Sequence, residues 1–211
     1  MDKLEYHNNP KTVFWNWFQK NSNKLFFLNQ IEDDDQRELI LDNFLNALHK
    51  YCDHLYFEIG GFSDDVQELI ITAEGNKDYF KKAEELIEVA PSLPNWEFIA
   101  LKQPAEGNFT TEYKGIKLIL NQILFLPLEK KENPSLLGLR LFINDYNPAR
   151  HGEYLTAAYL VLDSVLGEKS SALDIHHLEV ATMPISVENE KFYKLEKLPD
   201  FIIWRKKNHF G

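Results

Sequence analysis

Hydrophobic and polar positions alternate first with helical and then with strand-like periodicity along the chain. Aromatic residues at helical spacing predict a short helix over residues 12–20. One of the acidic residues at 33–35 is expected to cap a second helix, which ends near Tyr51. We therefore expect an N-terminal helical segment over residues 12–51. Its aromatic cluster favours docking onto a core, because the flanks are not basic enough for a membrane-surface helix.

Strand-like patterns take over at residue 55 and predict a ββαβ-like unit over residues 55–101. It consists of a hairpin of two strands, a helix with Asn76 as its N-cap, and a third strand. The expected ranges of these elements are 55–59, 68–73, 77–89 and 96–101.

A second ββαβ-like unit is predicted over residues 109–182. Its hairpin strands, helix and last strand are expected at 123–128, 139–143, 149–166 and 175–181, with Gly167 ending the helix. A short strand pair around the turn Lys114-Gly115 precedes them. The offset between the two units drifts from about 68 to 79 residues and their sequence identity is negligible. Coincidental recurrence of a common local arrangement stays open as the alternative to a duplication.

The remaining residues, 183–211, are expected to form a C-terminal edge, with a final edge strand at Phe201–Arg205. No Gly/Ser-rich or Pro-rich boundary separates the two ββαβ-like units, so the pattern predicts one compact domain over residues 1–211. The predicted fold class is α+β, with a mixed, mainly antiparallel sheet, two ββαβ-like units and an N-terminal helical segment.

Charge narrows the classes of partner. The 211 residues include 33 Asp and Glu against 23 Lys and Arg, for a net charge of −10. An acidic surface repels phosphate backbones, and only four of the basic residues are Arg, the side chain best suited to phosphates and guanine edges. We therefore expect no nucleic-acid partner.

Cysteine content and the N-terminus indicate a compartment. Cys52 is the only cysteine, so no intrachain disulfide forms, and the first residues lack a basic segment followed by an apolar one. The most apolar stretch, residues 116–128, is too short to span a bilayer. These features predict a cytoplasmic protein without membrane attachment. The excess of Lys over Arg, with many Asn and Ile, is typical of AT-rich bacterial genomes.

Motifs for catalysis are missing from the sequence. It contains no Gly-rich phosphate loop, nucleophile elbow, HExxH motif or dinucleotide fingerprint. The run from His49 to His54 and the pair His176-His177 contain metal-ligand residue types. The run from His49 to His54 is better explained as a helix C-terminus, where His complements the helix dipole. The pair His176-His177 lies in a predicted strand, where adjacent residues point to opposite faces and do not bind one ion easily. We expect no cofactor and no metal, and a non-catalytic protein is favoured over an enzyme.

One strand–helix corner offers candidate ligand-binding residues: Asn144, Arg150 and His151. Arg150 and His151 fall in the first turn of the predicted helix, where positive charge opposes the helix dipole. One hypothesis is a small anionic ligand held by these side chains and backbone N–H groups. The alternative is a salt bridge from Arg150 to Asp145 or Glu153.

The equivalent corner of the first unit adds Glu58 and Glu74 as candidates. Glu58 lies within the first hairpin strand, and Glu74 lies between a strand end and a helix start. The alternative for Glu74 is that it simply complements the helix dipole, and the alternative for Glu58 is an ordinary solvent-facing position.

Four segments together resemble an uncharacterised bacterial family of conserved hypothetical proteins. They are Phe14–Phe18, Glu68–Gly75, Ala90-Pro91 with the following Trp96, and Leu162–Glu168. The resemblance implies no activity and no functional residue. As a small, acidic α+β protein, the chain is also similar, at the level of class alone, to bacterial toxin-immunity proteins.

The function predicted from these features is that of a non-catalytic binding or regulatory protein that acts through a protein partner. The alternative is a small-molecule binding protein or enzyme that uses the corner near Arg150 and His151. Homodimer formation stays open.

Overall fold

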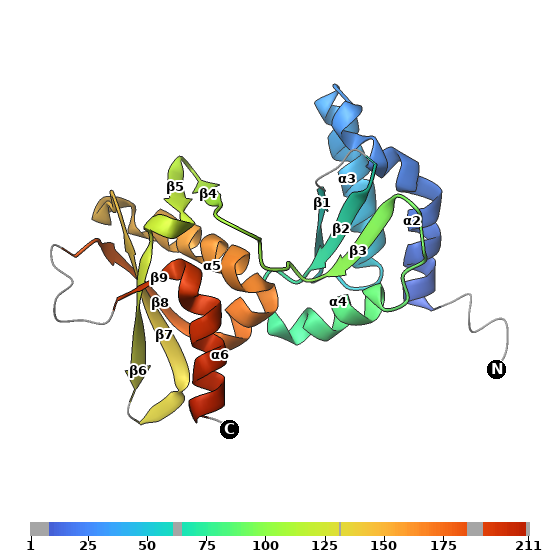
Figure 1. The fold of residues 1–211 in the computed structure, drawn as a ribbon. Helices are drawn as coiled ribbons and strands as arrows, with labels where there is room; N and C mark the ends of the chain where they lie inside the picture. The colour runs from blue at the N-terminus through green and yellow to red at the C-terminus, as the bar shows by residue number, and fades with distance from the viewer. Residues whose placement is uncertain (1–8, 61–64, 131, 185–191, 210–211) are drawn as a thin grey trace. The chain divides into compact units, whose positions relative to one another are not determined.

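A computed structural model describes residues 9–60, 65–130, 132–184 and 192–209 (Figure 1). The chain divides into two compact units, Met1–Lys102 and Gln103–Gly211, and each is described by itself. This differs from the single domain expected from the sequence. The junction near residues 103–108 is short and carries only one Pro and one Gly, so its composition gives no boundary signal.

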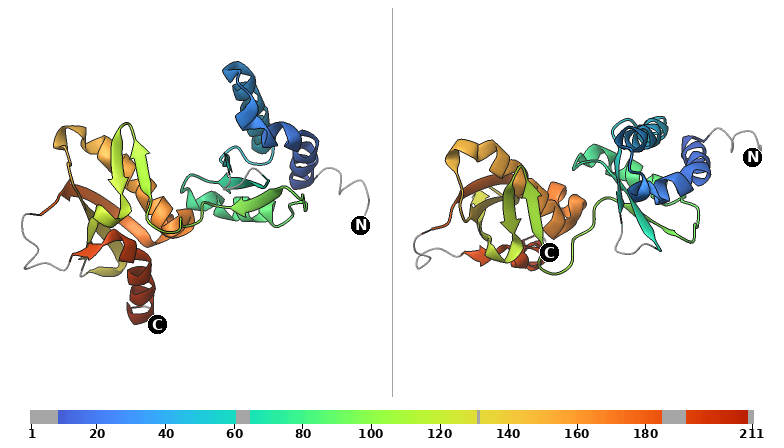
Figure 2. Two further views of the ribbon diagram at one scale, coloured as in Figure 1. Left: turned by 45° about the horizontal axis from the view of Figure 1, so that its top comes forward. Right: turned by 90° about the horizontal axis from the view of Figure 1, so that it is seen from above.

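Two helices open the N-terminal unit. Helix α2 (Pro10–Phe26) begins at Asn9, whose side chain accepts a hydrogen bond from the Lys11 N–H, and Pro10 occupies the first turn. A 3₁₀ turn, η1 (Leu28–Gln30), leads to α3 (Asp34–His49). Asp33 caps α3 by accepting from the Gln36 N–H, which confirms the predicted start of this helix. The connection between α2 and α3 projects beyond the end of the sheet of this unit (Figures 1 and 2).

A three-stranded sheet with a crossover helix completes the N-terminal unit. Its elements are β1 (Tyr56–Gly60), β2 (Gln67–Thr72), η2 (Lys77–Tyr79), α4 (Phe80–Ile87) and β3 (Trp96–Ala100). Strand β1 pairs antiparallel with β2, and β2 pairs parallel with β3, so β2 lies in the middle. The predicted ββαβ-like unit and its Asn76 cap are confirmed.

Aromatic rings fill the core of the N-terminal unit. Phe18 on α2 meets Trp96 on β3 with ring centroids 5.0 Å apart, and Phe44 on α3 meets Phe57 on β1 at 4.0 Å. The indole of Trp15 donates to the Leu86 carbonyl at 2.9 Å and so joins α2 to α4. The aromatic helix therefore docks onto the core of its unit, as the sequence predicted.

The C-terminal unit combines a β-hairpin, a four-stranded sheet and two helices. Its elements are β4 (Thr110–Tyr113), β5 (Ile116–Ile119), η3 (Leu120–Gln122), β6 (Leu124–Lys130), β7 (Asn133–Ile143), η4 (Pro148–Arg150), α5 (His151–Asp174), β8 (Ile175–Thr182), β9 (Tyr193–Lys194), η5 (Leu195–Lys197) and α6 (Leu198–His209). The sheet order is β8-β7-β6-β9, and only the β7–β8 pair is parallel. Helix α5 packs on β7 and β8 and also contacts β4, β5 and α6. The core lies between these elements. Together, the two units confirm the α+β class.

The two units repeat one topology. In each, the first strand pairs antiparallel with a central second strand, and a helical crossover returns to a third, parallel strand. The corner between central strand and helix matches residue for residue at an offset of 71. Glu74 corresponds to Asp145, both with positive φ, and Asn76 corresponds to Asn147, both capping a 3₁₀ turn of three residues. The drift in the offset between the two units, expected from the sequence, comes from the strands on either side of this corner. These strands belong to separate sheets.

Two predicted boundaries in the C-terminal unit are wrong. Gly167 adopts φ 74° and ψ 156°, so the helical path breaks there as expected, but it resumes and continues to Asp174. Phe201–Arg205 is part of helix α6 and not an edge strand. The two edge strands of the sheet are β8 and the two-residue β9. Of the predicted C-terminal edge, residues 185–191 and 210–211 lie outside the described residues.

Candidate functional site

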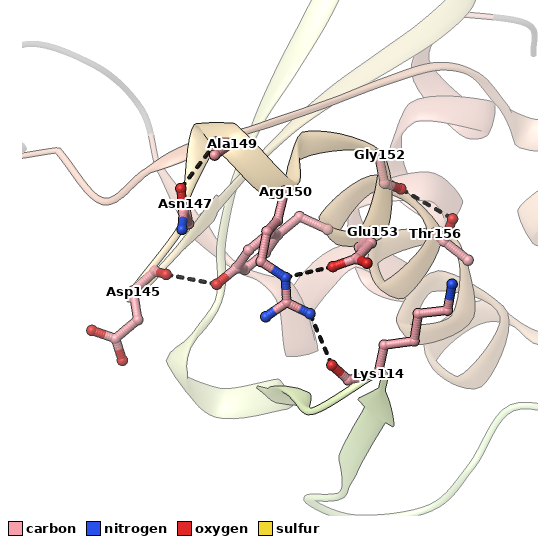
Figure 3. A network of polar contacts seen from close by, with 9 residues as sticks. Lys114, Asp145, Asn147, Ala149, Arg150, Gly152, Glu153 and Thr156 are labelled. Carbon is pink, nitrogen blue, oxygen red and sulfur yellow. Dashed lines mark hydrogen bonds and ion pairs between the residues drawn. The ribbon is translucent and has the colours of Figure 1, made fainter.

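The corner between β7 and α5 is built by local backbone capping. Asp145 has φ 56°, a left-handed conformation, and its carbonyl accepts a hydrogen bond from the Tyr154 hydroxyl at 2.6 Å. Asn147 then caps the 3₁₀ turn by accepting from the Ala149 N–H at 3.0 Å (Figure 3). These contacts fix the direction in which Arg150 leaves the start of α5.

Arg150 is satisfied by partners within its own unit. Its Nε donates to Glu153 at 2.5 Å and its Nη2 donates to the Lys114 carbonyl at 2.8 Å, on the β4–β5 turn (Figure 3). The salt bridge offered as one alternative by the sequence is thus confirmed for Glu153. It compensates the unfavourable position of Arg150 at a helix N-terminus, and it clamps the β4–β5 hairpin to α5.

A cavity of about 350 Å³ lies beside this clamp. Its lining includes Asn144, Asp145 and Arg150, the β5 residues Ile116–Ile119, and the apolar side chain of Ile143. The structure therefore brings Asn144 and Arg150 together. His151 is not part of this lining, and its Nδ1 lies 2.7 Å from the Tyr146 hydroxyl.

Glu58 and Glu74 belong to the other unit and do not share a site there. Glu58 is exposed on β1 and forms an ion pair with Lys102 at 3.0 Å. Glu74 is exposed at the β2–α4 corner, where its backbone N–H donates to the Thr72 hydroxyl. Both positions fit ordinary surface roles.

A second candidate surface lies at the tip of the α2–α3 pair, and the sequence analysis missed it. An open groove of about 470 Å³ runs between the end of α2 and the start of α3. Its lining is Asn23, Lys24, Phe27, Ile31, Gln36, Leu39, Ile40 and Asn43. Leu39 is 60% exposed and Phe27 is 48% exposed, so two large apolar side chains face solvent at its rim. We call this surface the α2–α3 groove.

Acidic side chains flank the α2–α3 groove on its α3 side, next to Leu39. Asp35 and Asp42 lie four and three residues from Leu39 on α3, so they are its neighbours on the helix surface. Glu38 precedes Leu39 in sequence and points to a different side of the helix. All three are exposed, and none has an ion-pair partner among the described residues. Arg37 pairs with Asp34 and with the Ile31 carbonyl instead.

The sequence held a signal for this surface. Five apolar residues of α3 recur at helical spacing: Leu39, Ile40, Phe44, Leu45 and Leu48. The core of the unit does not cover this whole face, because Leu39 is 60% exposed. The polar residues Asp42 and Asn43 interrupt it, and both have low helix propensity in mid-helix. An apolar stripe interrupted in this way indicates a partly exposed face.

The part of the chain that the structure describes contains no candidate metal cluster and no candidate membrane span. Among the described residues, no three His, Cys, Asp or Glu side chains gather closely enough to hold a metal ion. None of the helices described is long and apolar enough to cross a bilayer. Comparison with known proteins finds no matching family, no matching curated protein and no matching solved structure. The resemblance to an uncharacterised bacterial family stays a prediction.

Proposed function

We propose that this protein is a non-catalytic binding or regulatory protein of the bacterial cytoplasm that acts through a protein partner. The α2–α3 groove carries the proposal, because it exposes large apolar side chains beside carboxylates that have no described ion-pair partner. Protein interfaces combine an apolar centre with a polar rim in this way. A lone cysteine, Cys52, supports a reducing compartment.

The distribution of charge supports the same proposal. Residues 1–102 contain 19 acidic and 10 basic side chains, whereas residues 103–211 contain 14 and 13. The acidity of the protein thus belongs almost wholly to the unit that carries the groove. Such a surface attracts a basic protein over some distance and repels nucleic acid and anionic membranes.

The corner near Arg150 supports the small-molecule alternative less well. An anion bound there competes with Glu153 and with the Lys114 carbonyl for the guanidinium donors. The nearby Asp145 carboxylate would also repel it. The structure gives this corner a structural task, the clamping of the β4–β5 hairpin.

Native mass spectrometry of the full-length protein isolated from its own host tests the proposal. We expect a stoichiometric protein partner in the spectrum of the wild type, and the same partner with Arg150→Ala. An added mass of a small molecule that is lost with Arg150→Ala would contradict the proposal and support the alternative. A bare monomer or a homodimer would also contradict it.

A further inference from the structure

Resting on the proposed function, we infer that the partner presents a lysine- or arginine-rich segment whose bulky apolar side chain enters the α2–α3 groove. The volume of the α2–α3 groove is about 470 Å³. Clefts that bind a specific group usually have volumes of roughly 300–1,000 Å³. Its apolar contacts come from Phe27, Ile31, Leu39 and Ile40. Burying exposed apolar side chains of this size is the usual source of affinity at the centre of an interface.

The carboxylates around Leu39 specify the charge of that segment. Asp35, Glu38 and Asp42 lie on the exposed side of α3, and the nearest cation on the same helix, Arg37, is already paired with Asp34. Lys24 is the basic side chain in the groove lining. The local field at the rim is therefore negative, and a cationic segment gains both in association rate and in orientation.

Helix stability accounts for Asp35 but not for Glu38 or Asp42. Asp33 caps α3, and Asp34 and Asp35 stabilise its first turn through the helix dipole. Glu38 and Asp42 lie beyond the first turn, where this effect has faded. Asp42 also has low intrinsic helix propensity, so its position costs helix stability without a local return.

A second copy of this chain is a poor occupant of the groove. A two-fold contact through this surface brings the same acidic rim against itself, and like charges in a contact oppose association. A nucleic acid or an anionic lipid surface is repelled for the same reason. A basic protein segment satisfies both the apolar groove and its rim.

Selection from a random peptide library on the immobilised full-length protein tests the inference. We expect the enriched peptides to carry Lys or Arg on both sides of a bulky apolar residue. Measured by fluorescence anisotropy with the full-length protein, Leu39→Ser should weaken their binding by about tenfold or more. The double change Asp35→Asn, Asp42→Asn should weaken it by a similar factor at low salt and flatten its salt dependence.

Two matched variants separate the groove from general effects of hydrophobicity and charge. Val89→Ser removes an apolar side chain of similar exposure in the same unit, and Glu88→Gln with Glu97→Gln removes two carboxylates outside the groove. Both should change binding by less than about threefold, which is within the range of surface substitutions. Circular dichroism and thermal melting confirm that each variant is folded.

Enriched peptides without a basic bias would overturn the inference, as would equal losses in the groove variants and their controls. Failure to enrich any peptide over the Leu39→Ser protein would overturn it too. A host partner whose binding ignores Leu39→Ser and salt would leave the proposed function intact and refute the inference alone. The absence of any host partner would refute the proposed function itself.

Discussion

Replacing Phe44 by Ala should destabilise the N-terminal unit by about 4–5 kcal/mol. Phe44 has no exposed surface, and its ring meets those of Phe14 at 5.7 Å and Phe57 at 4.0 Å. Truncation of a buried Phe to Ala costs about 3–5 kcal/mol. Aromatic contacts are worth roughly 0.5–1.5 kcal/mol each beyond the buried area, so the loss at Phe44 should lie in the upper part of that range. The expected loss approaches the total stability of about 5–15 kcal/mol that a domain possesses.

Urea denaturation followed by tryptophan fluorescence measures this loss. Three of the four tryptophans, Trp15, Trp17 and Trp96, belong to the N-terminal unit, so the signal reports chiefly on that unit. Val13→Ala is the control, because Val13 lies on the same helical pair but is 45% exposed, and it should cost under about 0.5 kcal/mol.

Phe44→Leu keeps the test valid if the Ala variant does not fold. It preserves much of the buried volume and should cost about 1–2 kcal/mol. A loss with Phe44→Ala that matches the Val13→Ala control would show that the aromatic cluster is not the core of this unit.

Two groups give the protein a defined dependence on pH. Burial raises the pKa of Tyr51 to about 12 from 10.0, so its contribution to stability is complete below pH 10 and is lost as the pH rises toward 12. Ultraviolet titration of the wild type minus Tyr51→Phe measures this pKa, and a value near 10 would refute the buried environment. Hydrogen bonds from His177 and Arg140 lower the pKa of Glu179 below 4.5. Its contribution is therefore present above pH 4.5 and is lost as the pH falls through the lowered value, and solvent exposure keeps it small. Carbon-detected NMR titration should show this lowered pKa, whereas a value at or above 4.5 would contradict the ion pairs that Glu179 forms with Arg140 and His177.

The sequence predicted elements well where one local signal dominates. Asn76 was expected as one cap and one of the acidic residues at 33–35 as another, and in the structure Asn76 and Asp33 begin these elements. The predicted strand at Phe201–Arg205 failed because its aromatic and β-branched residues favour strands in isolation. In the structure, tertiary packing overrides this strand preference. It buries three residues at helical spacing, Leu198, Ile202 and Arg205.

The candidate site was harder to predict because it depends on what the core leaves uncovered. A salt bridge from Arg150 to Asp145 or Glu153 was the alternative to an anion site, and the structure shows the one to Glu153, three residues away on the helix. The second partner of Arg150, the Lys114 carbonyl, is remote in sequence and has no local signal. Leu39 belongs to the expected apolar face, but only the packing of α2 against α3 shows that it stays exposed.

The strand pairings also set an order in which the protein can fold during synthesis. Every strand of the N-terminal sheet lies between Tyr56 and Ala100, so that sheet is complete once this stretch has left the ribosome. In the C-terminal sheet, β6 pairs with β9, whose residues Tyr193 and Lys194 emerge about 70 residues later. Until then Leu124 and Phe125, the two β6 residues that pair with β9, have no strand partner on that side, and unpaired edges are where nascent chains aggregate. We therefore expect chaperone dependence during synthesis to be concentrated between the emergence of β6 and that of β9.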